Sequence, residues 1–314
     1  MIKDLQTNEF LNQANFLVKR LDKKMTSKGS PFYEAILSDR SGEIVARIWE
    51  NNFQACEIKE NTVISLEGTV QEYKNKKNII IESCKVDASK NTKSYVACIP
   101  TLVFDLETIG KDFEELDLVE QDYLLNNLEK NEEDKEKAKT KTGLYSVFGS
   151  ICAAGLFDVD LEKGTTIIIG DKEIEPEKDN FSYIVVKNEK ELIEKFWEIA
   201  KEYTNFVTYN GNNFDFPYLI NRSIINRVKV PINYQKYLNH FIDLMDKFKQ
   251  NNRGFKLEIL AKAMGIENPK EEGISGGDVN GLFKTKKYKL IADYVSRDAY
   301  STYLLYQIYK ENTL

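Results

Sequence analysis

The sequence predicts two domains, a small all-β barrel followed by an α/β domain. Residues 1–93 contain short strand-like runs between turn residues, whereas residues 97–314 combine strands with long amphipathic helices. A chain of 314 residues suits two domains, since domains usually have about 100 to 200 residues each. The 42% hydrophobic and 30% charged content supplies enough apolar side chains for two cores. The predicted linker is residues 90–93.

The composition excludes several classes of protein. No run approaches the roughly 18 apolar residues of a membrane span. Residues 1–5 lack the basic start and apolar core of a signal peptide, so we expect an intracellular, cytoplasmic protein without membrane contact. The cysteines are far apart and form no Cys-x-x-Cys pair, which argues against a zinc site or a disulfide framework. They are Cys56, Cys84, Cys98 and Cys152.

Charge is unevenly distributed along the chain. The net charge is −6, but residues 1–93 hold 15 Lys and Arg against 13 Asp and Glu, while the remainder holds 29 against 37. The first domain therefore carries the basic excess. A nucleic-acid partner needs only a basic track where its phosphates lie, so the overall negative charge does not exclude one.

The first domain reads as a barrel because its strand-like runs recur at short spacing. They cover residues 16–18, 31–37, 43–49, 62–73 and 77–86. Turn residues separate them, most clearly at 38–42 and 74–76. Gly68 lies inside a predicted strand, where it suits the bend or bulge that a small barrel needs at a corner.

Residues 33–49, with 63–70 and the basic hairpin after them, resemble the OB fold, in the version found ahead of some bacterial exoribonucleases and in tRNA-binding proteins. On that fold, exposed aromatic rings stack on bases and basic loops contact phosphates. The candidate contacts are Phe32, Tyr33, Trp49, Phe53 and Tyr73 with Arg47, Lys74, Lys76 and Lys77. Two other interpretations stay open, because rings in a small barrel often belong to its core, and the lysines would also suit a solvated hairpin.

The second domain mixes strands and helices. The predicted elements are a strand at 101–108, an exposed amphipathic helix within 111–141 that runs into a flexible charged segment, strands at 150–157 and 165–169, a helix at 189–203, a strand from 205 that enters an Asn/Gly turn, a helix from about 215, a strand at 240–245, and helices at 255–264 and 289–310. Gly265 ends the helix at 255–264.

Two acids close the apolar run 101–108. Alternation along a strand places Asp105 and Glu107 on one face, with Leu106 pointing the other way. Burial of such a pair costs several kcal/mol unless a cation neutralises it, and a hard, oxygen-seeking metal ion would do so. By itself, an Asp-x-Glu pair is more often a solvated strand end.

Two further acids lie downstream in similar contexts. Asp215 follows the strand and turn that begin at residue 205, where an N-cap of the next helix is the commonest role of an Asp. Tyr294 and Asp298 are four residues apart in the last helix and share a face, as an ordinary surface pair would.

Taken together, the strings at 104–108, 209–219 and 294–299 resemble the three exonuclease motifs of the DEDDy branch of DnaQ-like 3′-5′ exonucleases. The middle string is especially similar to that of B-family DNA polymerase proofreading domains. The resemblance covers nearly all of residues 97–314 and implies an RNase H-like fold, a mixed central sheet flanked by helices. The histidine branch is excluded, because Asp293 stands where that branch has its histidine.

The resemblance also implies roles for single residues. The metal ligands would be Asp105, Glu107, Asp215 and Asp298, which would hold two Mg²⁺ or Mn²⁺ ions, and Tyr294 would orient the attacking water. Asn210 and Phe214 match positions near the terminal nucleotides, and Thr108 at the end of the first motif is a further candidate substrate contact.

These inferences predict a metal-dependent 3′-5′ exonuclease that degrades single-stranded nucleic acid, with DNA favoured, while the barrel holds the strand. We expect a free-standing enzyme, because no polymerase palm or fingers follow the last helix. Three alternatives stay open: an exoribonuclease, a nucleic-acid-binding protein without catalysis, and a subunit of a repair or replication complex whose barrel binds a partner protein. The sequence does not decide the oligomeric state.

Overall fold

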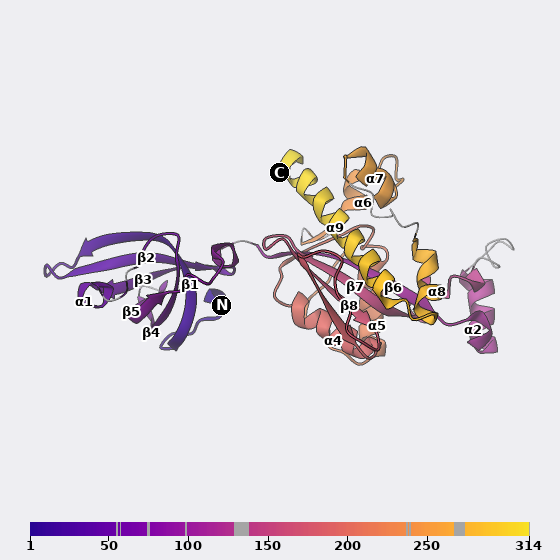
Figure 1. Ribbon diagram of the computed structural model, residues 1–314, viewed down its shortest axis with the longest axis horizontal. Coiled ribbons are helices and arrows are strands. Elements are labelled where there is room, and N and C mark those ends of the chain that lie inside the picture. Colours follow the sequence, from indigo (N-terminus) through magenta and orange to yellow (C-terminus); the bar gives the residue numbers. More distant parts are fainter. Residues whose placement is uncertain are drawn as a thin grey trace. The chain divides into compact units, whose positions relative to one another are not determined.

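The computed structural model describes residues 1–54, 56, 58–73, 76–97, 99–128, 138–236, 238, 240–266 and 274–313. It contains two compact units, Met1–Pro100 and Thr101–Leu314. Figure 1 shows the barrel of the first unit and the sheet and helices of the second.

The first unit is a closed five-stranded barrel in the order β1-β2-β3-β5-β4. The strands are β1 (Phe10–Met25), β2 (Pro31–Asp39), β3 (Gly42–Trp49), β4 (Val63–Tyr73) and β5 (Lys76–Val86). A short helix, α1 (Glu50–Gln54), follows β3. The closed barrel confirms the predicted OB fold. β1 is much longer than the predicted run at 16–18. Most side chains on either side of that run are polar, so they carry little strand signal.

Gly68 has the predicted role in the barrel. The register between β4 and β5 shifts between Glu67 and Gly68. A Cβ atom at position 68 would lie 2.3 Å from the Ile80 carbonyl oxygen, so the strands approach at this bulge only because residue 68 has no side chain.

The second unit is built on a six-stranded mixed sheet in the order β11-β10-β6-β7-β8-β9. The strands are β6 (Thr101–Gly110), β7 (Gly149–Asp158), β8 (Lys163–Ile169), β9 (Phe181–Val186), β10 (Asn205–Thr208) and β11 (Phe241–Asp243). The central strand β6 is antiparallel to β7 and parallel to β10. β6 pairs with β10 over only the first three residues of β6, so the rest of that edge is open to other partners.

Helices cover both faces of this sheet, as predicted. α4 (Glu189–Ala200) and α5 (Asp215–Ile225) pack on the face to which Phe104 points, whereas α9 (Tyr288–Thr313) crosses the other face over β6, β7 and β8 (Figure 1). The other α-helices described in this unit are α2 (Leu118–Tyr123), α6 (Leu244–Phe248), α7 (Leu257–Ala263) and α8 (Val279–Lys284). Among the described helices, none has the length and hydropathy of a membrane span.

The exposed helix predicted within 111–141 is present, but it is shorter and less regular than its apolar spacing indicated. The described part contains a 3₁₀ turn at Phe113–Glu115, then α2, then a π-helical turn at Leu124–Leu128. Asp117 and Glu120 form a reciprocal capping box, which starts a new helix inside the expected one. The flexible charged segment falls largely on residues 129–137, which lie outside the described residues.

Other differences concern short elements. β9 and α8 were not predicted, and the strand expected at 240–245 ends at Asp243, where α6 begins. The helices predicted at 189–203, 255–264 and 289–310 are present with shifted ends. Gly265 adopts a φ of 72°, the left-handed conformation that ends a helix.

Candidate active site

Three acids from two distant segments meet on the face of β6 that α9 covers. Asp105 and Glu107 come from β6, and Asp298 comes from α9. One carboxylate oxygen of each lies within 4.8 Å of those of the other two. Glu107 and Asp298 are buried, and Asp105 is partly buried. Alternation in β6 therefore has the predicted consequence that Asp105 and Glu107 share a face.

A glycine that the sequence analysis missed allows α9 to lie this close. Gly155 on β7 is the cross-strand neighbour of Asp105. A Cβ atom at Gly155 would lie 2.5 Å from the Val295 carbonyl oxygen of α9. The helix that carries Asp298 therefore lies against the sheet at the point where β6 presents Asp105. The small residues at 153–155 are the signal that could have predicted this contact.

Asp215 joins the site from α5. It is 3% exposed, and its Oδ1 accepts a hydrogen bond of 3.1 Å from the backbone N–H of Leu106. This bond uses the edge of β6 that β10 leaves open. The N-cap interpretation is wrong, because Phe214 is the N-cap and Asp215 is the first residue of the helix. Asp215 lies outside the three-acid set, but its charge acts on Asp105, so it is a neighbour of that set.

Burial and mutual repulsion disfavour ionisation of these acids when no cation is present. Burial raises the pKa of Asp105 well above its ordinary range, and the charges of Asp215, Asp298 and Glu107 raise it further. Burial raises the pKa of Asp215 to about 7, although its own backbone N–H and that of Leu106 favour the charged form. A divalent cation would remove the repulsion, and carboxylate oxygens are the ligands that Mg²⁺ and Mn²⁺ prefer. The donor set thus fits the implied ions.

Tyr294 lies one helical turn before Asp298 and is 5% exposed. Burial, followed by the charges of Asp298, Glu107 and Asp105, raises the pKa of its hydroxyl far above the ordinary value. The hydroxyl therefore keeps its proton at neutral pH. It can donate a hydrogen bond, but it cannot serve as a base.

The predicted substrate contacts of this unit lie close to the acids in sequence. Asn210 has a left-handed φ of 66°, and its Oδ1 accepts a hydrogen bond from the Asn213 side chain at 3.0 Å. Phe214 is half-buried against Tyr218, with ring centroids 5.3 Å apart. The Thr108 hydroxyl donates to the Gly143 carbonyl oxygen at 2.9 Å, so this proton is used within the chain.

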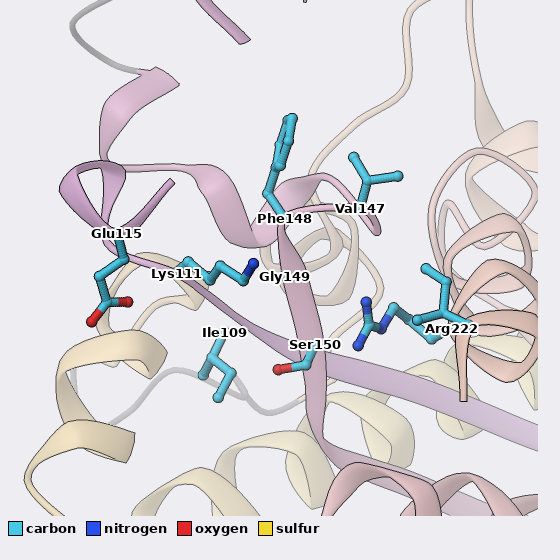
Figure 2. Close-up of a pocket in the computed structure, with 10 residues that line it drawn as sticks. Ile109, Lys111, Glu115, Val147, Phe148, Gly149, Ser150 and Arg222 are labelled. Atoms are coloured by element: carbon cyan, nitrogen blue, oxygen red, sulfur yellow. The ribbon is translucent and has the colours of Figure 1, made fainter. Parts of the chain in front are cut away.

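A cavity of about 570 Å³ begins on β6 directly after Thr108. Its walls include apolar side chains and two cations, Lys111 and Arg222. Figure 2 shows Lys111 extended toward Gly149, and the Arg222 guanidinium turned toward Ser150. Glu189 holds Arg222 by two hydrogen bonds, at 2.6 and 2.8 Å. Because the charges of Arg222 and Glu189 largely cancel, this wall of the cavity is polar without a strong positive charge. The two hydrogen bonds hold the Arg222 side chain in place.

In the first unit, the structure separates the candidate rings, which the sequence could not do. Tyr33 and Phe53 stack at 3.5 Å between centroids and pack against the barrel core. Trp49 is 47% exposed and pairs across the strands with Phe32, at 5.9 Å between centroids. The Arg47 guanidinium lies 5.9 Å from the Phe32 ring.

The barrel's other candidate contacts lie on the hairpin of β4 and β5. Tyr73 is 64% exposed, and Lys76 is exposed at the start of β5. The Lys77 ammonium donates to the Leu5 carbonyl oxygen at 2.5 Å, so it serves the barrel's own structure. Lys74 lies outside the described residues. We therefore define the aromatic face of the barrel as Phe32, Trp49 and Arg47.

Comparison with known protein families supports both units. Residues 183–312 match a family described as a predicted 3′-5′ exonuclease related to the exonuclease domain of PolB. Residues 18–87 match an OB-fold nucleic-acid-binding family. The exonuclease match includes Asp215, Tyr294 and Asp298, and it begins after the motif with Asp105 and Glu107. These matches confirm the resemblance to B-family proofreading domains combined with an OB-fold domain.

Individual relatives match over short stretches. The DNA polymerase of Methanocaldococcus jannaschii is 59% identical over 46 residues, 15% of this chain and 3% of that protein. That of Pyrococcus glycovorans is 34% identical over 82 residues, 23% of this chain and 11% of that protein. The matches thus span a small fraction of these relatives' length. A solved family B DNA polymerase from Pyrobaculum calidifontis aligns with 95% of this chain and 46% of its own, at 11% identity and a TM-score of 0.45.

Proposed function

We propose that this protein is a divalent-metal-dependent 3′-5′ exonuclease that shortens single-stranded nucleic acid, with DNA favoured, from a free 3′ end. The observation that carries the proposal is the convergence of Asp105, Glu107 and Asp298 within 4.8 Å, with Asp215 beside them. Each of these acids belongs to one of the three exonuclease motifs. A cluster of carboxylates whose repulsion calls for cations is the arrangement that two-metal phosphodiester hydrolysis requires.

Asp105, Glu107, Asp215 and Asp298 would together hold two ions. Bound in this way, two Mg²⁺ or Mn²⁺ ions would activate a water molecule and stabilise the departing 3′ oxygen. Tyr294 keeps its proton and would orient the water through a hydrogen bond.

The substrate strand would contact both units. Asn210, Phe214 and Thr108 would lie against the terminal nucleotides, because they flank Asp215 and Glu107 in sequence and in the fold. In the barrel, bases would stack on Phe32 and Trp49 while Arg47 and Lys76 attract phosphates. The short matches to DNA polymerases, with the family match related to the PolB exonuclease domain, support DNA as the substrate.

The test compares the full chain with Asp105→Asn on matched DNA and RNA single strands. One set carries a 5′ label and a free 3′ end, and a second set has a blocked 3′ end. We expect the wild type, but not Asp105→Asn, to shorten the free-ended strands only. This shortening should depend on Mg²⁺ or Mn²⁺, be faster on DNA than on RNA, and be absent in EDTA. Faster degradation of RNA would instead identify an exoribonuclease.

Two results would contradict the proposal. Shortening of strands with a blocked 3′ end would show a different polarity or an endonuclease. No shortening by the wild type, with strand binding intact, would leave a nucleic-acid-binding protein or a complex subunit. In that case, co-purification of a partner through the barrel becomes the experiment of choice.

A further inference from the structure

A buried carboxylate that is not one of the four acids accepts hydrogen bonds from the turn that leads to Asp215. Asp243 ends β11, where it lies opposite Thr208 of β10, and it is 2% exposed. Its Oδ1 accepts hydrogen bonds from the Asn210 N–H at 2.8 Å and the Met245 N–H at 3.0 Å. Its Oδ2 accepts one from the Asn212 N–H at 3.0 Å. Two of these donors belong to the segment between β10 and α5.

The segment that Asp243 contacts is constrained, so its position is transmitted along the chain. Asn210 is left-handed, with a φ of 66°, and a Cβ atom at Gly211 would lie 2.2 Å from Thr208 Oγ1. The Asn210 carbonyl oxygen accepts the Asn213 and Phe214 N–H groups, both at 3.1 Å. A displacement of the Asn210 backbone would therefore move the start of α5, where Asp215 lies.

An ionised aspartate fits these three donors better than any neutral side chain of its size. Both carboxylate oxygens only accept hydrogen bonds, whereas an asparagine would present one oxygen and one NH₂ group. The NH₂ group would face a backbone N–H, which would lose its partner in a buried place. Charge is not the benefit at the active site, because the Asp243 charge contributes to the raised pKa of Asp215 and so opposes its ionisation.

We infer that Asp243 is a positioning residue of the active site: by holding the backbone of residues 210–212, it sets where Asn210 and Asp215 lie relative to Asp105. For its catalytic consequence, the inference rests on the proposed exonuclease function. For its geometry, it rests only on the hydrogen bonds of the turn.

The chain contains a matched control for a substitution at this position. Asp158 is also a buried aspartate, 5% exposed, whose Oδ1 accepts the backbone N–H groups of Asp160 and Leu161 at 2.9 and 2.8 Å. It pairs with Leu102 at the opposite end of β6 from Glu107. Its Oδ2 accepts the Tyr203 hydroxyl at 2.7 Å. Asp158→Asn therefore alters a buried aspartate of a turn away from the acids, but it keeps an oxygen for both N–H groups, and its NH₂ group can donate to the Tyr203 hydroxyl.

The experiment measures, for the full-length wild type and both variants, the melting temperature in EDTA, Mn²⁺ binding without substrate by calorimetry, and kcat and KM on a labelled single strand. We expect Asp243→Asn to lose more thermal stability than Asp158→Asn, because only Asp243 accepts backbone N–H groups on both oxygens. Asp243→Asn should also weaken Mn²⁺ binding and lower kcat, each about 10- to 100-fold, the usual effect of losing a group that supports a metal ligand. Asp158→Asn should leave Mn²⁺ affinity and kcat unchanged.

A double variant tests whether Asp243 acts through Asp215. If it does, Asp243→Asn should weaken Mn²⁺ binding little further in an Asp215→Asn background. Full additivity there, or equal effects of Asp243→Asn and Asp158→Asn on Mn²⁺ binding, would overturn the inference. So would an Asp243→Asn protein that is unfolded at every temperature while Asp158→Asn folds. If the wild type binds Mn²⁺ but lacks nuclease activity, the proposed function fails, and the calorimetric comparison still decides the role of Asp243.

Discussion

The two units differ in which side chains they bury. Among the described residues of the barrel unit, Asp39 is the one buried acid, and it accepts N–H groups from Ile2 and Ser41. The α/β unit buries several acids, most of them beside the site or bonded to its turns. These are Glu107, Asp158, Asp215, Asp243, Asp293 and Asp298. Among the described residues, the smaller barrel unit exposes the rings of Phe10, Trp49 and Tyr73, whereas the larger α/β unit exposes those of Tyr123 and Phe255.

This difference assigns different tasks to the units. Buried like charges lower the stability of the metal-free fold, so a fold that carries them needs a compensating ligand. Exposed rings leave apolar area in water that a stacking partner would cover. The α/β unit is thus suited to chemistry with cations, and the barrel to binding without chemistry. The following predictions test this contrast, from the largest expected effect to the smallest.

Removing two acids of the cluster should abolish activity without harming the fold. Asp105→Ala with Glu107→Ala should reduce Mg²⁺-dependent shortening of a single strand by about 1000-fold or more, roughly 4 kcal/mol in barrier. The melting temperature in EDTA should stay the same or rise, because repulsion is relieved. As a control for charge, Glu194→Ala with Glu198→Ala on the exposed side of α4 should keep full activity. Full nuclease activity in Asp105→Ala with Glu107→Ala would show that the assignment of the active site is wrong.

Tyr294→Phe should have a smaller effect than loss of a ligand. The substitution deletes one hydrogen-bond donor and leaves all four acids, so we expect about a 10- to 1000-fold lower kcat. Mn²⁺ affinity, measured by calorimetry, should be unchanged. Loss of metal binding would show that the Tyr294 hydroxyl supports the structure of the cluster.

Deleting residues 1–93 should weaken binding and spare chemistry. The α/β unit keeps the four acids and its own cores. Affinity for long single strands should fall roughly 10- to 100-fold and depend less on salt. The measurement is kcat/KM of the truncated form relative to the full chain as strand length increases. A ratio that stays flat with length would mean that the barrel does not hold the substrate, and a partner-binding barrel would replace that role.

Trp49→Ala should reproduce part of this loss. One stacked ring is worth at least about 1 kcal/mol, so we expect an approximately 5-fold or greater loss of affinity for long strands in fluorescence anisotropy. Phe10→Ala is the matched control, because Phe10 is a 56% exposed ring of β1 outside the aromatic face of the barrel. Equal losses from both substitutions would mean that the aromatic face has no special part in binding.

The metal-free protein should become less stable as the pH rises. Asp215 has an ordinary pKa of 3.8 and a folded-state pKa of about 7, so between these values the folded state binds more protons than the unfolded state. Stability contributed by this proton is present below about pH 4 and is lost as the pH rises through 7. In EDTA, the melting temperature should therefore fall by a few °C between pH 5.5 and 8, at about 2–4 °C per kcal/mol.

Asp215→Asn should flatten this dependence on pH, and saturating Mn²⁺ should remove or reverse it, because the ion binds the carboxylate in its ionised form. An equally steep fall in the variant would place the titrating group elsewhere in the cluster.

The sequence by itself determined most of the kinds of elements and predicted which acids form the candidate site. Alternation predicted that Asp105 and Glu107 share a face of β6, because side-chain direction along a strand depends only on residue spacing. The three motifs predicted Asp215, Tyr294 and Asp298 as further site residues without any knowledge of the sheet order. Within 111–141 the sequence predicted a helix but not its start, because the capping box at Asp117 begins the helix after Leu116.

The tertiary structure decided which groups meet and which rings face water. The contact of α9 with the sheet depends on the missing side chain of Gly155, and the bond from Leu106 N to Asp215 depends on how far β10 extends along β6. Likewise, Tyr33 and Trp49 have similar sequence contexts, but the first stacks on Phe53 and the second is exposed. Such contacts depend on the distance between elements that are far apart in the chain, and local spacing carries no information about that distance.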